Sequence, residues 1–237
     1  MPIPTRLLAA TLVGGLTLGL AAPAIAETET ETSDPAKRCI EQIDRRLDSL
    51  ASAQSRAAGV DAVTDSHLAT IDAIIDSTEA GLDALIPEIE AAEDRETLAA
   101  LCRSIATDFR VYLVVLPQTH LTVGADRVEA AVDRGEELVA TFDAAVDAAI
   151  DAGADVTDAV ALRDAAAAHL EAAEAAVAGV GDEVLTVTPA AWNEGGGQTI
   201  IEQSRAAVHS GHAEIKDGIA DGTAAIEALR AAIGDLG

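Results

Sequence analysis

Aromatic side chains are nearly missing from this chain: its 237 residues include one Trp, one Tyr and two Phe. Aromatic side chains usually supply much of the buried area of a globular core. Hydrophobic residues still make up 49% of the chain, so its core must be built from Ala, Val, Leu and Ile. Such side chains suit thin, closely packed helices better than a deep interior with a ligand cavity.

Basic residues are scarce too, and only Lys37 and Lys216 are lysines. The 41 Asp and Glu outnumber the 15 Lys and Arg, which gives a formal net charge of −26 at pH 7. Binding to nucleic acid requires clustered Lys and Arg that neutralise phosphates, so the composition excludes that class of partner. Dense carboxylates are typical of a hydrated, soluble surface.

Long apolar runs are confined to the N-terminus. Arg6 precedes an apolar stretch over residues 7–20, and small residues follow it around residue 26. This order is that of a secretory signal peptide, which we predict over residues 1–26. The apolar stretch is too short to span a bilayer. We therefore expect a secreted, extracellular protein with no stable membrane insertion after cleavage.

The next segment, residues 27–34, is acidic and is expected to be a disordered leader. Beyond it, apolar residues recur at spacings of three and four, in places with heptad spacing, which predicts helices typical of a coiled coil or bundle. Capping residues predict where these helices begin. The expected starts are Asp34 with Pro35, Thr64, Asp94, Asp155, and the capping box Thr199 to Glu202, the last following a loop over 190–198.

The predicted fold is all-α: an elongated antiparallel bundle of about five long helices. We expect two three-helix bundles, over residues 35–117 and 118–237, that share one long helix bent at Pro117. A loop near 119–124 is the alternative to the bend, and one continuous five-helix bundle is the alternative to two. Glycines at 211, 218 and 222 lie near the apolar stripe of the last helix, which predicts that another backbone approaches there.

The two cysteines, Cys39 and Cys102, lie in a chain that we expect to be exported, where thiols are normally oxidised. In an up-down-up bundle the first and third helices are parallel. Both cysteines lie within two turns of the predicted start of their helix, and hence at the same level. The sequence therefore predicts a disulfide between them.

Motifs that carry catalysis are missing from the sequence. It has no G-x-S-x-G elbow, no phosphate-binding glycine loop after a strand, and no Cys-His pairing with a third orienting group. The Glu-x-x-His pattern of di-iron bundles and the Cys-x-x-Cys-His pattern of haem attachment are missing too. We predict a protein that is not an enzyme, holds no cofactor, and has a structural or interaction role with a protein or cell-surface partner.

One pattern has the spacing of metal ligands. His209 and His212 lie three residues apart, so they share one helical face and could bind a transition metal with a third ligand. An extracytoplasmic metal-binding protein is therefore the alternative function, although two exposed histidines on an acidic helix also arise by chance.

The segment around residues 109–127 differs most from the rest of the chain. Arg110, Tyr112, His120 and Arg127 gather there and form a possible partner patch. The alternative is an ordinary core segment in which the Tyr112 hydroxyl is hydrogen-bonded and the two arginines pair with nearby acids.

The run IATDFRVYLVVLPQTHLTVGADR, residues 105–127, stands among Ala-rich helices. With them it resembles a group of uncharacterised secreted Ala-rich helical proteins of high-GC Gram-positive bacteria. The likeness covers most of the mature chain. It implies an exported helical protein and carries over no catalytic residue.

Overall fold

The computed structural model describes residues 34–235, and all of the regular structure in that range is helical. The prediction of an all-α fold is confirmed. The predicted signal peptide and residues 27–33 of the predicted leader lie outside the described residues, and Asp34 is the N-cap of the first helix. Among the described helices, none is both long enough and apolar enough to cross a membrane.

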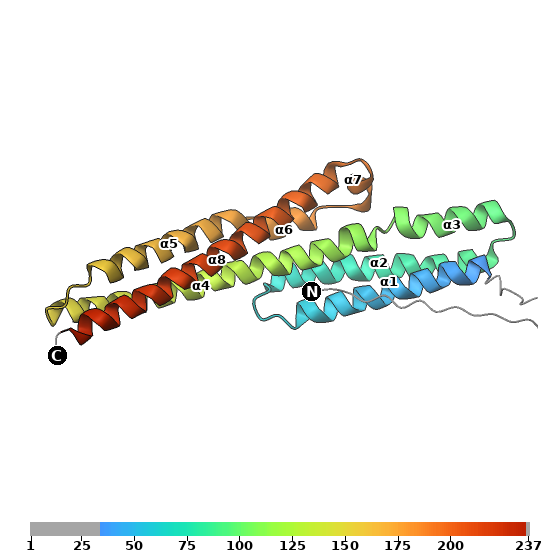
Figure 1. Cartoon of the computed structure of the whole chain (residues 1–237). Coiled ribbons are helices and arrows are strands. Elements are labelled where there is room, and N and C mark those ends of the chain that lie inside the picture. Colours follow the sequence, from blue (N-terminus) through green and yellow to red (C-terminus); the bar gives the residue numbers. More distant parts are fainter. Residues whose placement is uncertain (1–33, 236–237) are drawn as a thin grey trace, which may run out of the picture. The chain divides into compact units, whose positions relative to one another are not determined.

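Three helices form the N-terminal part of the described chain (Figure 1). They are α1 (Pro35–Ala58), α2 (Asp65–Ala91) and α3 (Arg95–Thr107), and each packs against the other two. The side chains of Asp34, Thr64 and Asp94 accept backbone N–H groups in their first turns, so these three predicted caps are confirmed. Their shared core consists of aliphatic side chains, the largest fully buried ones being Ile43, Leu50, Ile71, Ile75, Leu82, Ile89 and Ile105.

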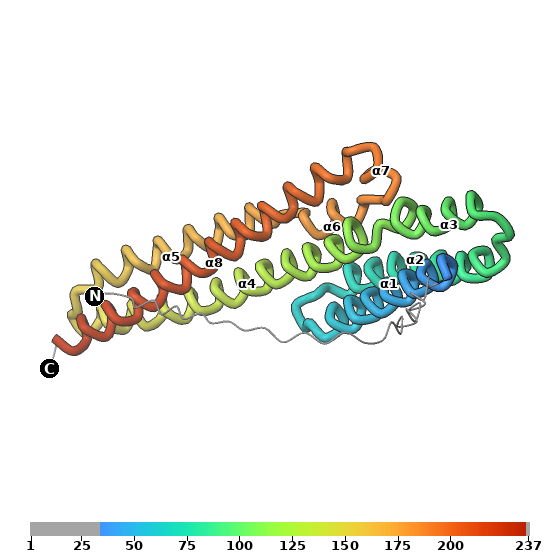
Figure 2. Tube along the Cα trace, turned by 45° about the vertical axis from the view of Figure 1, so that its right-hand side comes forward, coloured from blue at the N-terminus to red at the C-terminus, as the bar shows by residue number. Residues whose placement is uncertain are grey.

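The second group of helices consists of α4 (Leu116–Asp151), α5 (Thr157–Val177) and α8 (Gly196–Gly234). These three run side by side in both views (Figures 1 and 2). Two short helices, α6 (Val180–Leu185) and α7 (Pro189–Asn193), connect α5 to α8. The core of this group is built mainly from Val, Leu and Ala on α4, α5, α6 and α8.

The long central helix is interrupted at Arg110, ahead of the bend expected at Pro117. Arg110 has φ 45°, a left-handed conformation that is uncommon for residues other than glycine. A short π-helix, η1 (Val111–Val115), follows and continues directly into α4. Pro117 lies in the first turn of α4 and has no backbone N–H, so it cannot donate to a carbonyl of η1 one turn before it. The structure thus has a break at Arg110 that the sequence did not predict. A bend at Pro117 itself stays a prediction, and residues 119–124 are helical.

The boundaries after α4 also differ from the expected ones. The helix expected from Asp155 ends at Val177, because Gly179 adopts φ 70° and starts α6 in a new direction. The stretch expected to be a loop contains α7, and α8 begins at Gly196 after Gly195 at φ 93°. The capping box predicted at Thr199 is wrong, because that residue lies inside α8.

The predicted close approach of a backbone to α8 is confirmed at the contact with α5. A Cβ atom at Gly211 would lie 2.8 Å from Val177 Cγ1 and 3.0 Å from Val128 Cγ1. A Cβ atom at Gly218 would lie 3.2 Å from the Cβ atom of His169. The glycines therefore leave the space that α5 occupies.

The predicted disulfide between Cys39 and Cys102 is confirmed. It joins the beginning of α1 to α3, with 5.5 Å between the two Cα atoms and 63 residues of sequence separation. The bond closes a loop that contains all of α2.

Removing this bond should lower the stability of the protein. A loop of that length predicts a loss of about 4 kcal/mol in the free energy of unfolding of Cys39→Ser/Cys102→Ser, because the unfolded chain gains entropy. Urea denaturation measures the loss. Wild-type protein in reducing agent is the control and should lose a similar amount, whereas two free thiols in a mass spectrum of the non-reduced protein would contradict the bridge.

The glycines of α8 allow a matched comparison. Gly211→Ala should lower the free energy of unfolding by about 1–3 kcal/mol, because the added methyl group clashes with two valines. Gly222→Ala should instead raise it by up to about 1 kcal/mol through helix propensity, because a Cβ atom there would lie 4.0 Å from the nearest one, on Ala166. Thermal or urea unfolding tests both, and equal effects at the two positions would argue against the close approach at Gly211.

Candidate functional site

The two groups of helices meet where α1 contacts α4 and also at residues 180–193, which contain α6 and α7 and which we refer to as the junction segment. Leu185 in this segment packs against the core of α1–α3 and also against the core of α4, α5 and α8. Val184 beside it is fully buried. The junction segment therefore takes part in both cores, and its polar contacts define the candidate site.

A buried amide fixes the end of α6. Gln118 of α4 is buried, and its Nε2 donates to the carbonyl oxygens of Val184 at 2.9 Å and Val187 at 2.7 Å. The last carbonyls of a helix have no partner within that helix. Gln118 gives the Val184 carbonyl of α6 a further donor, beside the Val187 N–H, and supplies a donor to the Val187 carbonyl just after the helix.

A histidine between two carboxylates lies at the other end of α6. His67 Nδ1 lies 2.8 Å from Oδ1 and 3.0 Å from Oδ2 of Asp126 on α4, and its Nε2 lies 3.3 Å from Oδ1 of Asp182 on α6. The Asp126 side chain is only 1% exposed and also accepts the Thr64 backbone N–H at 3.1 Å. A Cβ atom at Gly181 would lie 2.6 Å from the imidazole, so only glycine lets the ring lie against α6.

The charges in this cluster shift its titration. Burial alone lowers the pKa of His67, but the hydrogen bonds and charges of Asp126 and Asp182 outweigh it, and the pKa is raised above its ordinary value. Nearby on α4, burial and then the charge of Asp126 raise the pKa of Glu129. A protonated His67 donates from both ring nitrogens and so joins α2 to α4 and α6 at once.

A second polar contact holds α7. The Arg110 Nε donates to Oδ1 of Asn193 at 2.8 Å, and Nδ2 of Asn193 donates to the backbone oxygen of Thr107 at 3.0 Å. Thr107 is the last residue of α3, so Asn193 satisfies a carbonyl at the helix end. The left-handed residue Arg110 thereby joins the break in the central helix to the junction segment.

A comparable histidine lies between α5 and α8. His169 Nδ1 lies 2.7 Å from Oε2 of Glu214, and its Nε2 lies 3.5 Å from Oδ2 of Asp221. The hydrogen bond to Glu214 raises the pKa of His169, against desolvation and with help from neighbouring acids. This cluster is more exposed than that of His67 and lies away from the junction segment.

The residues of the predicted partner patch point to different neighbours. The Arg110 side chain binds the amide of Asn193 on α7. An acidic partner was the expectation for this arginine. The Tyr112 hydroxyl donates to the backbone oxygen of Arg45 on α1 at 3.3 Å, and the Arg46 guanidinium carbon lies 5.3 Å from the Tyr112 ring centroid. Tyr112 itself remains half exposed.

The other two patch residues, His120 and Arg127, are exposed on α4. Partial burial and then the charge of Arg56 lower the pKa of His120. Arg110 and Tyr112 thus face different helices, and a patch that combines all four residues stays a prediction.

The predicted metal ligands His209 and His212 are both exposed on α8. Within residues 34–235 no group of three or more His, Cys, Asp or Glu side chains is placed to hold a metal ion. Metal binding by this pair stays a prediction, and the structure places no third ligand beside it.

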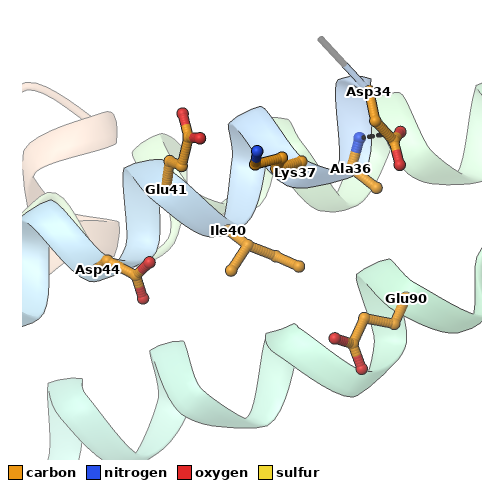
Figure 3. A pocket seen from close by; sticks show the side chains of 7 residues that line it. All are labelled: Asp34, Ala36, Lys37, Ile40, Glu41, Asp44 and Glu90. Carbon is orange, nitrogen blue, oxygen red and sulfur yellow. Dashed lines mark hydrogen bonds between the residues drawn. The ribbon is translucent and has the colours of Figure 1, made fainter.

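Surface grooves occur along α1. One is lined by α1 residues and by Glu90 of α2, and its wall is largely acidic (Figure 3). Its lining residues are Asp34, Ala36, Lys37, Ile40, Glu41, Asp44 and Glu90. Another is lined by residues of α1 alone. Both are open to solvent, and the carboxylates in the first spread apart along two helices, so the candidate site remains at the junction segment.

No spacing of residues along the chain indicates the His67 cluster. Its three side chains come from three helices, and Asp182 follows His67 by 115 residues. Comparisons with protein families, with curated proteins and with solved structures find no match for this chain.

The buried amide at the end of α6 allows a test of this arrangement. Gln118→Met should lower the free energy of unfolding by about 1–3 kcal/mol, because the Val187 carbonyl then loses its side-chain donor and the Val184 carbonyl keeps only backbone donors. Gln54→Met on α1 is the matched control, since Gln54 Nε2 donates to Asp72 at a half-buried site, 3.0 Å away. We expect a loss below about 1 kcal/mol for the control. Equal losses in urea denaturation would show that Gln118 has no special role.

Proposed function

We propose that this chain is an exported, non-catalytic helical protein that binds another protein along one exposed face of α8. The predicted signal peptide and the confirmed disulfide support export. The resemblance to secreted Ala-rich helical proteins points the same way. The proposed binding face is defined by Ile219, Ile226 and Ile233 together with Arg205, Lys216 and Arg230, and we refer to it as the α8 outer face.

The observation that carries the proposal is a row of exposed isoleucines. Ile219, Ile226 and Ile233 are 65%, 44% and 48% exposed and recur every seven residues on α8. Seven residues are close to two helical turns, so the three side chains lie along one line. Exposed apolar side chains in such a row resemble the seam by which helices bind partner helices.

Lys216 and Arg230 lie beside this row, and Arg205 lies about 21 Å before Ile219 along α8. Arg205, Lys216 and Arg230 are the Lys and Arg residues of α8, and all three are exposed. At 100° per residue they share a sector of about 100° with the isoleucines. The acids of α8 lie outside that sector; they are Glu202, Glu214, Asp217, Asp221 and Glu227.

None of the three cations takes part in a salt bridge within the described residues. A face that combines apolar side chains with unpaired cations is complementary to a partner surface of apolar side chains and carboxylates. We therefore propose an acidic protein partner with a helical ridge or groove.

The buried polar groups support a role other than catalysis. Gln118 and Asp126 are both buried, and each is hydrogen-bonded to backbone or side-chain groups of another helix. The hydroxyl of Thr119 donates to the Val115 carbonyl at the end of η1. Gln118 and Asp126 thus hold helices together, which supports a structural role for these groups.

Two double variants test the α8 outer face. Ile226→Ser/Arg230→Ser removes one isoleucine and one cation a single turn apart, and should weaken capture of the partner from culture supernatant by about tenfold in Kd. Capture should also weaken as salt is raised from 0.05 to about 0.5 M, because the cations contribute to it. Quantitative pull-down followed by mass spectrometry measures both effects.

The matched control lies on α4. Arg134→Ser/Leu138→Ser likewise removes one cation and one apolar side chain that lie four residues apart. Leu138 is 70% exposed. We expect this variant to keep the wild-type Kd within about twofold. If both variants capture the same proteins with the same affinity as wild type, the α8 outer face is not the binding surface.

A further inference from the structure

We propose that the contact of His67 with Asp126 and Asp182 is a pH-sensitive latch that holds α6 against α2 while the imidazole is protonated and releases it when the proton leaves. This proposal is independent of the α8 outer face. It rests on the geometry of three side chains that belong to α2, α4 and α6.

The two carboxylates differ in how strongly they hold the ring. Asp126 is buried, has both oxygens within 3.0 Å of Nδ1, and accepts the Thr64 backbone N–H as well. Asp182 is 88% exposed and has one oxygen 3.3 Å from Nε2. The tighter and more buried contact keeps the last proton of the ring on Nδ1.

A neutral imidazole has one N–H donor and one lone pair. With the donor on Nδ1, the hydrogen bond to Asp126 remains, and Nε2 presents a lone pair to a negatively charged Asp182. The attraction across the second contact is then lost, and the exposed carboxylate turns to water. Loss of the proton therefore releases the first turn of α6 from α2 and leaves α2 bound to α4, while Leu185 stays in the core of α1–α3.

The charged groups that face the ring come from α4 and α6. Asp126 and Asp182 act on His67 directly, and Glu129 of α4 senses the charge of His67. The cation of α1 in this region, Arg56, acts on His120. The ring is therefore surrounded by carboxylates, which stabilise its protonated form.

The direction of the pH effect follows from the sign of the shift. The pKa of His67 in the folded protein is raised above its ordinary value of 6.5. The stabilisation is therefore fully present below pH 6.5 and is lost as pH rises through the folded pKa. Gln118 and the valines of α6 do not titrate, so the other end of α6 stays in place.

Hydrogen exchange of the mature, disulfide-bonded protein between pH 5 and 9 tests the latch. After correction for the intrinsic pH dependence of exchange, the protection of α6 amides should fall at least tenfold with rising pH. Amides in the middle of α2 should keep their protection. The readout on α6 separates this latch from the His169 cluster, which joins α5 to α8.

Two substitutions of the exposed partner distinguish the latch from general instability. In Asp182→Asn the amide accepts from protonated His67 and donates to the neutral ring, so α6 should stay protected across the whole pH range. In Asp182→Ala the α6 amides should be weakly protected at every pH.

Nuclear magnetic resonance titration of the His67 ring supplies a second measurement. It should give a pKa above 6.5 in wild type and a lower one in Asp182→Ala. A flat protection profile in wild type, or a profile in Asp182→Asn that falls as in wild type, would overturn the proposal.

Discussion

The close contact between α5 and α8 is the constraint on which much of this structure depends. A chain with so few aromatic side chains buries little apolar area per residue, because Ala and Val are small. Its helices must therefore lie close together over a long distance to gain enough contact. Gly211 and Gly218 allow that approach, and Ala173 of α5 is fully buried in it. The length of α8, 39 residues, follows from the same need.

The features that depend on neighbouring residues could be predicted from the sequence. The helix starts at Asp34, Thr64 and Asp94 are fixed by side chains that bond to the backbone two or three residues away, which a linear pattern shows directly. The Cys39–Cys102 pairing followed from helix direction and level, which the spacing of apolar residues determines. In these places local preference and tertiary contact favour the same structure.

The features that depend on distant residues could not be predicted. A left-handed arginine at 110 is unfavourable locally, and its side chain is hydrogen-bonded to Asn193 of α7, 83 positions away. The helix expected to begin at Thr199 begins at Gly196 instead. Its N-cap, Gly195, has a positive φ and is the first of three consecutive glycines in the sequence. The cluster at His67 combines residues from three helices and leaves no periodic pattern along the chain.

The covalent bond between α1 and α3 has a mechanical consequence for a protein that is pulled at its ends. The chain between Cys39 and Cys102, which are 63 positions apart, includes all of α2 and cannot lengthen under tension while the bond is intact. Fully extended, it would span roughly 200 Å. When the molecule is stretched, the chain beyond Cys102 can therefore unfold and extend. The loop closed by the disulfide, which contains α2, does not extend.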